Sequence, residues 1–524
     1  MADARYTATI AAIVALGGFL MGFDASVISG VVGFIEVEFE LSKIELGWSV
    51  SSLTLMATFA MMVAGPLSDR IGRRPVLRIA AVLFAVSAVA SALAPDFITL
   101  VLARMLGGLG VGAALIIAPM YIAEIAPGKI RGRLVSFNQL NIVIGISAAF
   151  FSNYLILTFG ESGAAWAESL GLGVWNWRWM LGVEAVPAVL YLVALTRVPE
   201  SPRWLALRHR EEDALVVLER VNGQEQARAE LQAIHASIAQ DDAPKGINFT
   251  ELFRPNLRLV LTIGITVGVL QQITGINSVF FYAPMIFEQS GIGTNAAFMQ
   301  AVLVGLVNLV FTLVAMAYID RIGRRPLLGL GLAGIALSML TLSWSFGSAT
   351  YALDDEAIES LPVEIAATEL RPVAGIVYQS DVEFRDAVSG AIGADQYQLY
   401  ESDLVKASIN AQPMLILVAI LGFVASFAVS IGPIMWVLFS ELFPTSVRGL
   451  AISFVGLVNS AVAFLVILVF PWELQTLGNS MTFLIYGVIA AVGLVFVMRI
   501  LPETSGRSLE ELETLLTGTE SRPQ

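Results

Sequence analysis

The chain has 524 residues, of which 56% are hydrophobic and only 14% are charged. Soluble domains carry about a quarter charged residues, so these proportions exclude a typical soluble enzyme, and the apolar content excludes intrinsic disorder. The formal net charge of −13 repels nucleic-acid phosphates. Cysteine is absent and only two histidines are present, so we expect no disulfide, no metal site and no thiol nucleophile.

Twelve apolar stretches are long enough to cross a bilayer as helices, which takes about 20 residues each. In chain order they lie at 9–34, 46–67, 76–94, 97–121, 133–158, 178–197, 257–288, 298–319, 326–346, 412–440, 449–471 and 480–501. We therefore predict an all-α membrane protein with twelve transmembrane helices.

Positive charge distinguishes the two predicted sides of the membrane. Basic residues gather in the loops after the second, fourth and eighth stretches: Arg70, Arg73, Arg74, Arg78, Lys129, Arg131, Arg133, Arg321, Arg324 and Arg325. Cytoplasmic loops are the ones enriched in Lys and Arg. We therefore expect these loops and both termini in the cytoplasm, and the chain in the cell membrane.

Two long connections interrupt the series of apolar stretches. Residues 198–256 carry mixed-charge helical patterns and form a predicted cytoplasmic helical linker between an N-terminal half, 1–197, and a C-terminal half, 257–501. Residues 347–411, on the extracellular side, hold twelve acidic and three basic residues, which is nine of the thirteen net negative charges. This segment is either a disordered acidic insertion or a small folded lid. Residues 502–524 form a short cytoplasmic tail.

The two halves repeat each other. Residues 65–75 read GPLSDRIGRRP after the second stretch, and residues 320–326 read DRIGRRP after the eighth, with an offset of 251 residues. A second repeat relates EIAPGKIRG at 124–132 to ELFPTSVRG at 441–449. Two six-helix halves with matching loops indicate a pseudo-two-fold axis along the membrane normal, the architecture of transporters that bind substrate at the midplane.

Further motifs occur in a fixed order along the chain. They are Gly22-Phe-Asp24, Arg104-Met-Leu-Gly-Gly-Leu-Gly-Val-Gly112, Pro199-Glu-Ser-Pro-Arg-Trp204, Gln271-Gln-Ile-Thr-Gly-Ile-Asn277, Gly432-Pro433 with Trp436, and Pro502-Glu-Thr-Ser-Gly-Arg507. With these motifs the chain resembles the sugar porter family of the major facilitator superfamily over nearly its whole length. Within that family it is most similar to bacterial proton-coupled sugar symporters of the xylose–proton type. The resemblance implies secondary transport of a monosaccharide, a hexose or a pentose, into the cell by proton symport with alternating access.

Three ionisable residues lie inside predicted spans: Asp24, Arg104 and Glu184. Such residues are costly in lipid unless they are paired or line water, so they are functional candidates. The resemblance implies that Asp24 and Arg104 couple proton movement to transport and that Glu184 modulates them, whereas facilitative glucose carriers have a neutral residue in place of Asp24. The alternative is a static ion pair that only holds helices together.

Amide side chains suit a sugar because they donate and accept hydrogen bonds at once. The resemblance places sugar contacts at Gln139, Gln271, Gln272, Asn277, Asn308, Trp436 and Asn459. The alternative for each amide is an interhelical hydrogen bond. Phe281, Ser460, Met21 and Ile146 depart from common family residues, which leaves hexose, pentose and cyclic polyol open. Gly275 lets the seventh helix bend or break near this site.

Repeated charges at the cytoplasmic helix ends form a predicted gate. With the aromatic Tyr282 on the other side, the gate residues are Asp69, Arg73, Glu124, Arg131, Asp320, Arg324, Glu441 and Arg448. Ion pairs in a wet location contribute only about 1 kcal/mol each, so such a gate is reversible. The alternative to a gate is that the positive charges only set the orientation of the chain in the membrane. This explains the arginines but not the carboxylates that recur in both halves.

Two other functions remain open, a facilitative uniporter for a sugar or a cyclic polyol such as inositol, and a non-transporting sugar sensor. An enzyme is not expected, because no nucleophile–base pair or phosphate-cradling loop is found. The glycine run at 107–112 lies within a predicted membrane helix with no preceding strand, so a dinucleotide site is not expected there. We expect no cofactor, and as partners a sugar, protons and the lipid bilayer, with a monomeric chain.

Overall fold

The structure is a computed structural model that describes residues 4–127, 130–241, 252–362, 367–444 and 447–504. Within these residues, eleven helices are long and apolar enough to cross a membrane. The last of them, α25, contains two of the predicted stretches, because its backbone breaks at Gly478 with φ 79°. All twelve predicted stretches therefore fall on helices, which satisfy their own backbone hydrogen bonds in lipid. The prediction of a helical membrane fold is confirmed.

The helices of the N-terminal half follow one another through short turns. Its membrane helices are α1 (Ala4–Val27), α3 (Lys43–Ile71), α4 (Arg73–Ala92), α5 (Phe97–Ile125), α6 (Arg131–Gly160) and the pair α8 (Asn176–Gly182) and α9 (Ala185–Ala194). Between them lie η1 (Ile28–Gly30), α2 (Val32–Glu38) and α7 (Ala165–Ser169). The segment after α9 contributes α10 (Pro202–Leu207), α11 (Glu211–Asn222) and α12 (Gln224–Asp241).

The C-terminal half contains two membrane helices that are interrupted. Its helices are η3 (Pro255–Leu257), α13 (Arg258–Ile273), α14 (Ile276–Phe281), α15 (Ala283–Glu288), α16 (Thr294–Ile322), α17 (Arg324–Gly347), α23 (Pro413–Val429), α24 (Ile431–Leu442) and α25 (Arg448–Ile500). The break between α13 and α14 centres on Gly275, whose φ of 88° is left-handed and favours glycine. The break between α23 and α24 falls at Ser430, two residues before Gly432-Pro433.

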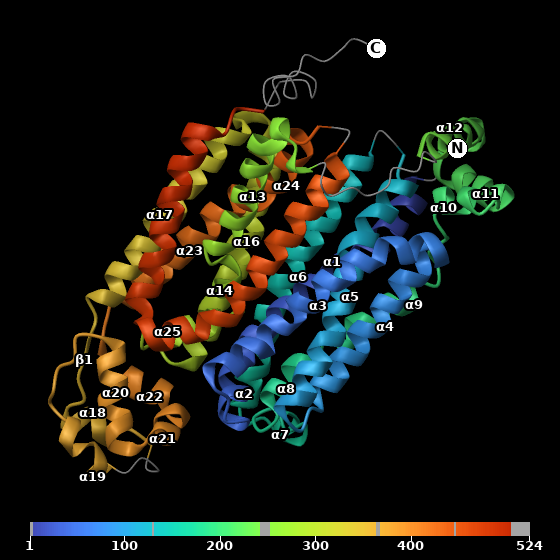
Figure 1. Cartoon of the computed structure of the whole chain (residues 1–524). Coiled ribbons are helices and arrows are strands. Elements are labelled where there is room, and N and C mark those ends of the chain that lie inside the picture. Colours follow the sequence, from blue (N-terminus) through green and yellow to red (C-terminus); the bar gives the residue numbers. More distant parts are fainter. Residues whose placement is uncertain (1–3, 128–129, 242–251, 363–366, 445–446, 505–524) are drawn as a thin grey trace. The chain divides into compact units, whose positions relative to one another are not determined.

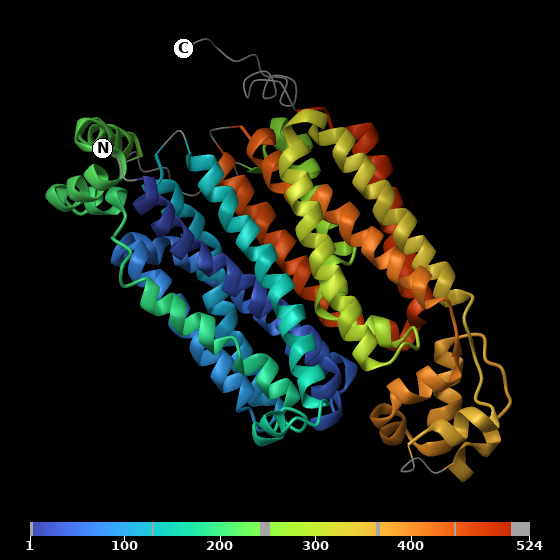
Figure 2. The same cartoon turned by 180° about the vertical axis from the view of Figure 1, so that it is seen from behind.

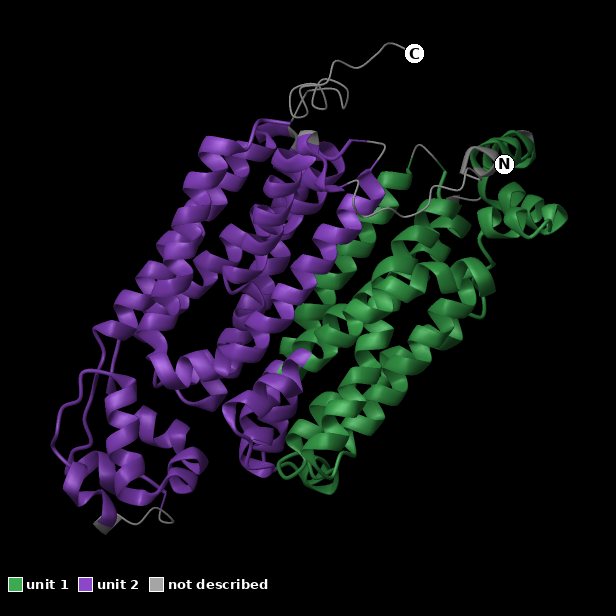
Figure 3. Ribbon diagram, viewed as in Figure 1, with its two compact units in different colours: residues 1–28, 52–152, 164–247 green, residues 29–51, 153–163, 248–524 purple. Residues whose placement is uncertain are grey.

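Two compact units divide the chain, and Figure 3 colours them separately. The first contains residues 1–28, 52–152 and 164–247, and the second contains residues 29–51, 153–163 and 248–524. Helix α2, the beginning of α3 and the end of α6 thus belong to the second unit, although the rest of α3 and α6 belongs to the first.

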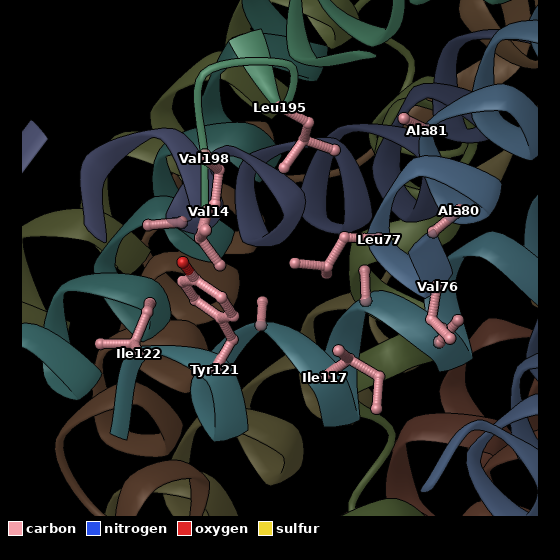
Figure 4. Packing of buried hydrophobic residues seen from close by; sticks show 14 of the residues in the cluster. Val14, Val76, Leu77, Ala80, Ala81, Ile117, Tyr121, Ile122, Leu195 and Val198 are labelled. Atoms are coloured by element: carbon pink, nitrogen blue, oxygen red, sulfur yellow. The ribbon is translucent and has the colours of Figure 1, made fainter. Parts of the chain in front are cut away.

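The core of the first unit lies where α1, α4, α5 and α9 pack together. Figure 4 shows Val14, Leu77, Ile117 and Tyr121 of these helices and Leu195, directly after α9, pointing toward one another, and all five are buried. Tyr121 is the polar exception, and its hydroxyl donates to the carbonyl of Pro199 at 2.9 Å. A buried tyrosine hydroxyl usually finds such a partner.

Close helix packing explains the glycine run of α5. A Cβ at Gly108 would lie 2.3 Å from the carbonyl oxygen of Leu53, and one at Gly112 would lie 2.2 Å from that of Ala57. Small residues four apart let membrane helices approach closely, so α5 lies directly against α3. These glycines therefore serve helix packing.

The acidic insertion is folded. Residues 349–411, which we term the loop domain, contain β1 (Thr350–Tyr351), α18 (Asp355–Ser360), α19 (Ala367–Leu370), η4 (Arg371–Val373), α20 (Asp381–Ile392), α21 (Ala394–Leu399), α22 (Glu401–Ser408) and β2 (Ile409–Asn410). These elements form one group beyond the ends of α17 and α23 (Figure 1), which the reverse view also shows (Figure 2). Of the two alternatives, a folded segment is the one that the structure shows.

The loop domain has a hydrophobic core of its own. Phe384, Val388 and Leu404 are at most 1% exposed, and the ring of Tyr351 stacks on Phe384 at 5.5 Å between centroids. Its two ends meet, because β1 and β2 pair antiparallel and place Thr350 opposite Asn410. Several of its acidic residues stand at helix starts, where negative charge is stabilising.

Candidate functional site

A buried ion pair joins α1 to α5 in the first unit. Arg104 Nη1 lies 2.5 Å from Asp24 Oδ1 and also donates to the carbonyl oxygen of Asp24 at 3.1 Å. Both residues are only 1% exposed. Charges this deep in a membrane protein mark ion pathways and proton relays, so the two residues that the sequence singled out as ionisable are in direct contact.

Glu184 lies near this pair, at the break between α8 and α9. It is 2% exposed and close enough to interact electrostatically with both Asp24 and Arg104. Within the described residues, Glu184 Oε1 and Asp24 Oδ2 have no hydrogen-bond partner. Each carboxyl group therefore keeps one oxygen that can accept a proton.

Two residues around Asp24 were not predicted from the sequence. A Cβ at Gly107 would lie 2.6 Å from Asp24 Oδ2 and 2.6 Å from Ser87 Oγ. The missing side chain of Gly107 thus makes the room in which the carboxylate lies. The spacing of Gly107 three residues after Arg104 was the available signal, because these positions share a helix face.

Four amides form a hydrogen-bonded cluster in the second unit. Gln272 Nε2 donates to Gln271 Oε1 at 3.1 Å and to Asn459 Oδ1 at 3.2 Å. Asn277 Nδ2 donates to Gln272 Oε1 at 2.7 Å, and Asn459 Nδ2 donates to Gln271 Oε1 at 2.9 Å. The cluster therefore brings together four of the seven predicted sugar contacts, from α13, α14 and α25.

Backbone carbonyls orient the amide cluster from two sides. Asn459 Nδ2 donates to the carbonyl oxygen of Gly268 at 2.8 Å, and Gln271 Nε2 donates to those of Ile431 and Gly432 at 3.3 Å each. These last two carbonyls belong to the first residues of α24, directly after the break at Ser430. Amides held in this way present fixed donors and acceptors, which is what recognition of sugar hydroxyls requires.

The other predicted sugar contacts lie apart from this cluster or differ in exposure. Asn308 on α16 is buried, but no hydrogen bond joins it to the four amides in the described part of the chain. Trp436 on α24 is 50% exposed and packs edge-to-face on Phe439 at 6.0 Å. Gln139 is exposed on α6 in the first unit. Tyr282 is buried and donates to the carbonyl oxygen of Ile467 at 3.2 Å.

The predicted gate residues of the first unit form an ion-pair cluster. Arg73 binds Glu124 through two nitrogens, Nη2 at 3.0 Å and Nε at 3.1 Å, and binds Asp69 through Nη1 at 2.7 Å. Arg131 instead pairs with Glu230 of α12, at 3.9 Å. Two-nitrogen binding of a carboxylate by arginine is strong and directional, so Arg73 joins the C-terminal ends of α3 and α5.

The second unit repeats this cluster. Arg324 Nη2 binds Glu441 Oε1 at 2.9 Å, and Thr504 donates to the other oxygen of Glu441 at 2.6 Å. Arg448 Nε donates to the carbonyl oxygen of Phe443 at 3.0 Å. The side chain of Asp320 lies outside the described residues. The ion pairs of each cluster lie within one unit.

A glutamate at an equivalent position of each half caps a helix in its unit. Glu200 accepts from the backbone nitrogens of Arg73 at 3.0 Å and Arg74 at 3.2 Å. Glu503 accepts likewise from the backbone nitrogen of Arg324, at 3.0 Å. The first backbone N–H groups of a helix have no partner within it, so these acids complete the starts of α4 and α17. The Pro-Glu segments after each half thus hold the predicted gate in place.

Comparison with known proteins places these features in one family. The family model described as "Sugar (and other) transporter" matches residues 10–367 and 396–516. The arabinose-proton symporter of Bacillus subtilis is 36% identical over 95% of this chain and 93% of its own length. The D-xylose-proton symporter of Escherichia coli is 33% identical over 98% and 96%.

A solved structure has the same fold. The inward-open conformation of the xylose transporter XylE from E. coli matches with a TM-score of 0.73 and 31% identity, over 97% of this chain and 99% of that one. The family model leaves residues 368–395 unmatched, and these residues include η4 and α20 of the loop domain.

Proposed function

The chain belongs to the family of sugar transporters, and on that premise we propose that it carries a monosaccharide, a hexose or a pentose, into the cell together with a proton. It is a membrane transporter of the major facilitator type and not an enzyme. The proposal adds the proton, the direction and the substrate class to that membership. The relatives named above are described as symporters of arabinose and of D-xylose, each with a proton.

The observation that carries the proposal is the contact between Asp24 and Arg104. A carboxylate beside a guanidinium stays ionised, whereas a carboxylate in a dry pocket takes up a proton. Asp24 has one oxygen bound by Arg104 and one oxygen without a described partner. Separation of the pair during alternating access would let Asp24 load a proton, and its return would release that proton. Glu184 adds a second buried carboxyl group that modulates this exchange.

The amide cluster supports a neutral sugar as the cargo. Gln271, Gln272, Asn277 and Asn459 offer donors and acceptors without a net charge, which matches hydroxyl groups. Breaks at Gly275 and Ser430 lie beside the cluster in sequence, and interrupted helices are typical of transporter binding sites. We extend the binding role to Gln139, Asn308 and Trp436 as part of the same proposal.

The paired clusters around Arg73 and Arg324 serve as the cytoplasmic gate in this proposal. The Arg73–Glu124 and Arg324–Glu441 side chains are only 5–19% exposed, so in this proposal the gate opens as water reaches these charges, because exposed ion pairs are worth about 1 kcal/mol or less. The basic loops that contain them also favour a cytoplasmic position for both termini.

Uptake into liposomes tests the proposal. Purified protein would be reconstituted and supplied with D-xylose, L-arabinose, D-glucose and myo-inositol, with the outer medium more acidic than the lumen. Symport predicts uphill accumulation of at least one sugar and alkalinisation of a weakly buffered medium when that sugar is added. Uptake that only equilibrates, with no pH change, would show a uniporter, and binding without uptake would show a sensor.

A further inference from the structure

A polar cavity lies between the loop domain and the neighbouring ends of the membrane helices, all within the second unit. Its volume is about 370 Å³, which lies in the range of small-molecule pockets. Residues of α20, α21 and α22 form one wall, and residues of α3, α15 and α25 contribute to the others. The amide cluster and the buried ion pair described above do not line it.

Hydrogen bonds hold the loop domain against the turn between α2 and α3. Lys43 Nζ binds Glu36 Oε1 at 2.5 Å and lies 3.7 Å from Glu401 Oε2 of α22. Gln398 Nε2 donates to the carbonyl oxygen of Leu41 at 3.2 Å. One lysine thus bridges two carboxylates across the cavity wall, and both carboxylates line the cavity.

A second set of hydrogen bonds holds the loop domain against the break in α25. Asp381 Oδ2 accepts from the backbone nitrogen and from Nδ2 of Asn479, each at 2.8 Å. Gln289 of the turn after α15 donates to Glu401 Oε1 at 2.9 Å. Contacts on both sides therefore fix the walls before any ligand enters, and preorganised walls lower the entropic cost of binding.

Several polar groups of the walls have hydrogen-bonding capacity that the protein does not use. The hydroxyls of Tyr351 and Tyr397 and the terminal nitrogens of Arg385 have no hydrogen-bond partner among the described residues, and the contact of Arg385 with Asp386 runs through Nε at 3.6 Å. Asn479 Oδ1 is buried and likewise unpaired within the described chain. Of these groups, only Asn479 Oδ1 is a fully enclosed atom without a partner. The tyrosine hydroxyls and the Arg385 nitrogens are therefore open to the cavity and available to a polar ligand.

The composition of the walls selects the class of ligand. The cavity is lined by planar carboxylate, guanidinium and amide groups, which can bind pairs of hydroxyls, and by the aromatic rings of Tyr351, Phe384 and Tyr397. Aromatic faces pack on apolar C–H surfaces. Four carboxylates against two cations line the cavity, so an anion is repelled, and Lys43 and Arg385 disfavour an organic cation. A neutral polyol with the size of one sugar ring remains.

We propose that this cavity is a second binding site for a neutral monosaccharide or cyclic polyol, separate from the amide cluster. Asp381, Phe384 and Arg385 come from the segment that the family model leaves unmatched, so the general family pattern does not account for these three wall residues. The choice of a sugar as ligand rests on the proposed transport function, whereas the existence of the site rests on the cavity.

Thiol protection tests the site, because the natural chain has no cysteine and one introduced thiol is the only one. Ser389→Cys places the thiol on the α20 wall of the cavity, in a full-length chain that also carries Gln272→Ala and Asn459→Ala to disable the amide cluster. Purified protein is labelled with a small methanethiosulfonate reagent at increasing D-xylose, L-arabinose, D-glucose or myo-inositol. We expect at least one of them to slow labelling in a saturable manner, and D-gluconate to have no effect.

Matched variants make the result specific. Ser360→Cys lies exposed on α18 and does not line the cavity, so its labelling should not respond to sugar. Tyr397→Phe, added to Ser389→Cys, removes one hydroxyl and should raise the half-protecting concentration about fivefold. Tyr378→Phe, in the same domain but outside the cavity walls, should leave it unchanged.

Three results would overturn the proposal. The first is labelling at Ser389→Cys that no neutral polyol slows, and the second is equal protection at Ser360→Cys. The third is no labelling at either Ser389→Cys or Ala394→Cys, because this would show that the cavity is closed to small molecules. Protection is measured without transport. Failure of liposome uptake with protection intact would therefore reject the transport function alone, and unprotected thiols with active uptake would reject only the second site.

Discussion

Replacement of Asp24 by asparagine removes the charge that pairs with Arg104 while it preserves the shape of the side chain. The backbone carbonyl oxygen of Asp24 accepts from Arg104 Nη1 at 3.1 Å, and the amide oxygen of asparagine can replace the carboxylate oxygen as an acceptor, so the guanidinium keeps hydrogen bonds and loses its counter-charge. If Asp24 carries the proton, the variant can still exchange sugar across the membrane but cannot use a proton gradient.

The size of the effect follows from the energy that one proton supplies. A charge that crosses 100 mV gains about 2.3 kcal/mol, which supports an accumulation ratio of about 50 at one proton per sugar. The ratio for the variant should be about 1. Loss of one partner of a buried ion pair also costs about 3–5 kcal/mol of stability, here reduced by the remaining contact with Arg104 and by the nearby Glu184.

Liposomes loaded with labelled sugar separate the two effects. Counterflow exchange, measured without a gradient, reports binding and conformational cycling, and uptake with an acidic exterior reports coupling. The double variant Asp24→Asn with Arg104→Gln removes both charges and should recover stability but not accumulation. Uphill accumulation by the folded Asp24→Asn protein would refute the reasoning, as would equal loss of exchange and accumulation, since the latter fits a static ion pair.

Three further predictions concern the same fold. Asn459→Leu leaves Gln271 and Gln272 without their partner, a loss of about 1–3 kcal/mol, so the KM of sugar exchange should rise at least fivefold; an unchanged KM would contradict a binding role. Gly107→Ala places a methyl group against Asp24 Oδ2 and should impair sugar accumulation more than sugar exchange. The control Gly108→Ala disturbs packing on Leu53, so it should lower the thermal unfolding temperature and affect accumulation and exchange equally. Burial raises the pKa of Glu36 above its usual 4.5. The positive charge of Lys43 partly opposes this rise, and the negative charge of Glu401 adds to it. Its contribution to stability is therefore full at acidic pH and is lost as pH rises through the raised pKa. Glu36→Gln should remove this pH dependence of the unfolding temperature. An unfolding temperature that varies with pH as in the unmodified protein would exclude Glu36 as the cause.

The membrane helices were predictable because hydrophobic length is a local property of the sequence. The Gly275 break could be anticipated for the same reason, since glycine tolerates positive φ. The Gly432-Pro433 motif likewise signals a break in its helix, because proline has no backbone N–H to donate, and the structure places that break at Ser430. The binding of the Ile431 and Gly432 carbonyls by Gln271 could not be anticipated, because it depends on how α13 packs on α24.

The site was predictable only in part. Asp24 and Arg104 stood out because charge in a membrane span is rare, but their direct contact depends on how α1 packs on α5. Ser87 and Gly107 are ordinary residues for a membrane helix, and only the packed structure shows that they surround the carboxylate. The loop domain was harder still, because its core is assembled from short helices whose acidic faces resemble a disordered segment.

The pairing of β1 with β2 has a consequence for how this protein can evolve. Because Thr350 lies opposite Asn410, the chain leaves α17 and returns to α23 through one narrow neck, whatever lies between. Loop-closure entropy grows only slowly with the length of an insertion. The neck therefore lets the intervening sequence lengthen, shorten or be exchanged between lineages while the register of the flanking helices stays the same, and it offers a point for grafting a reporter domain.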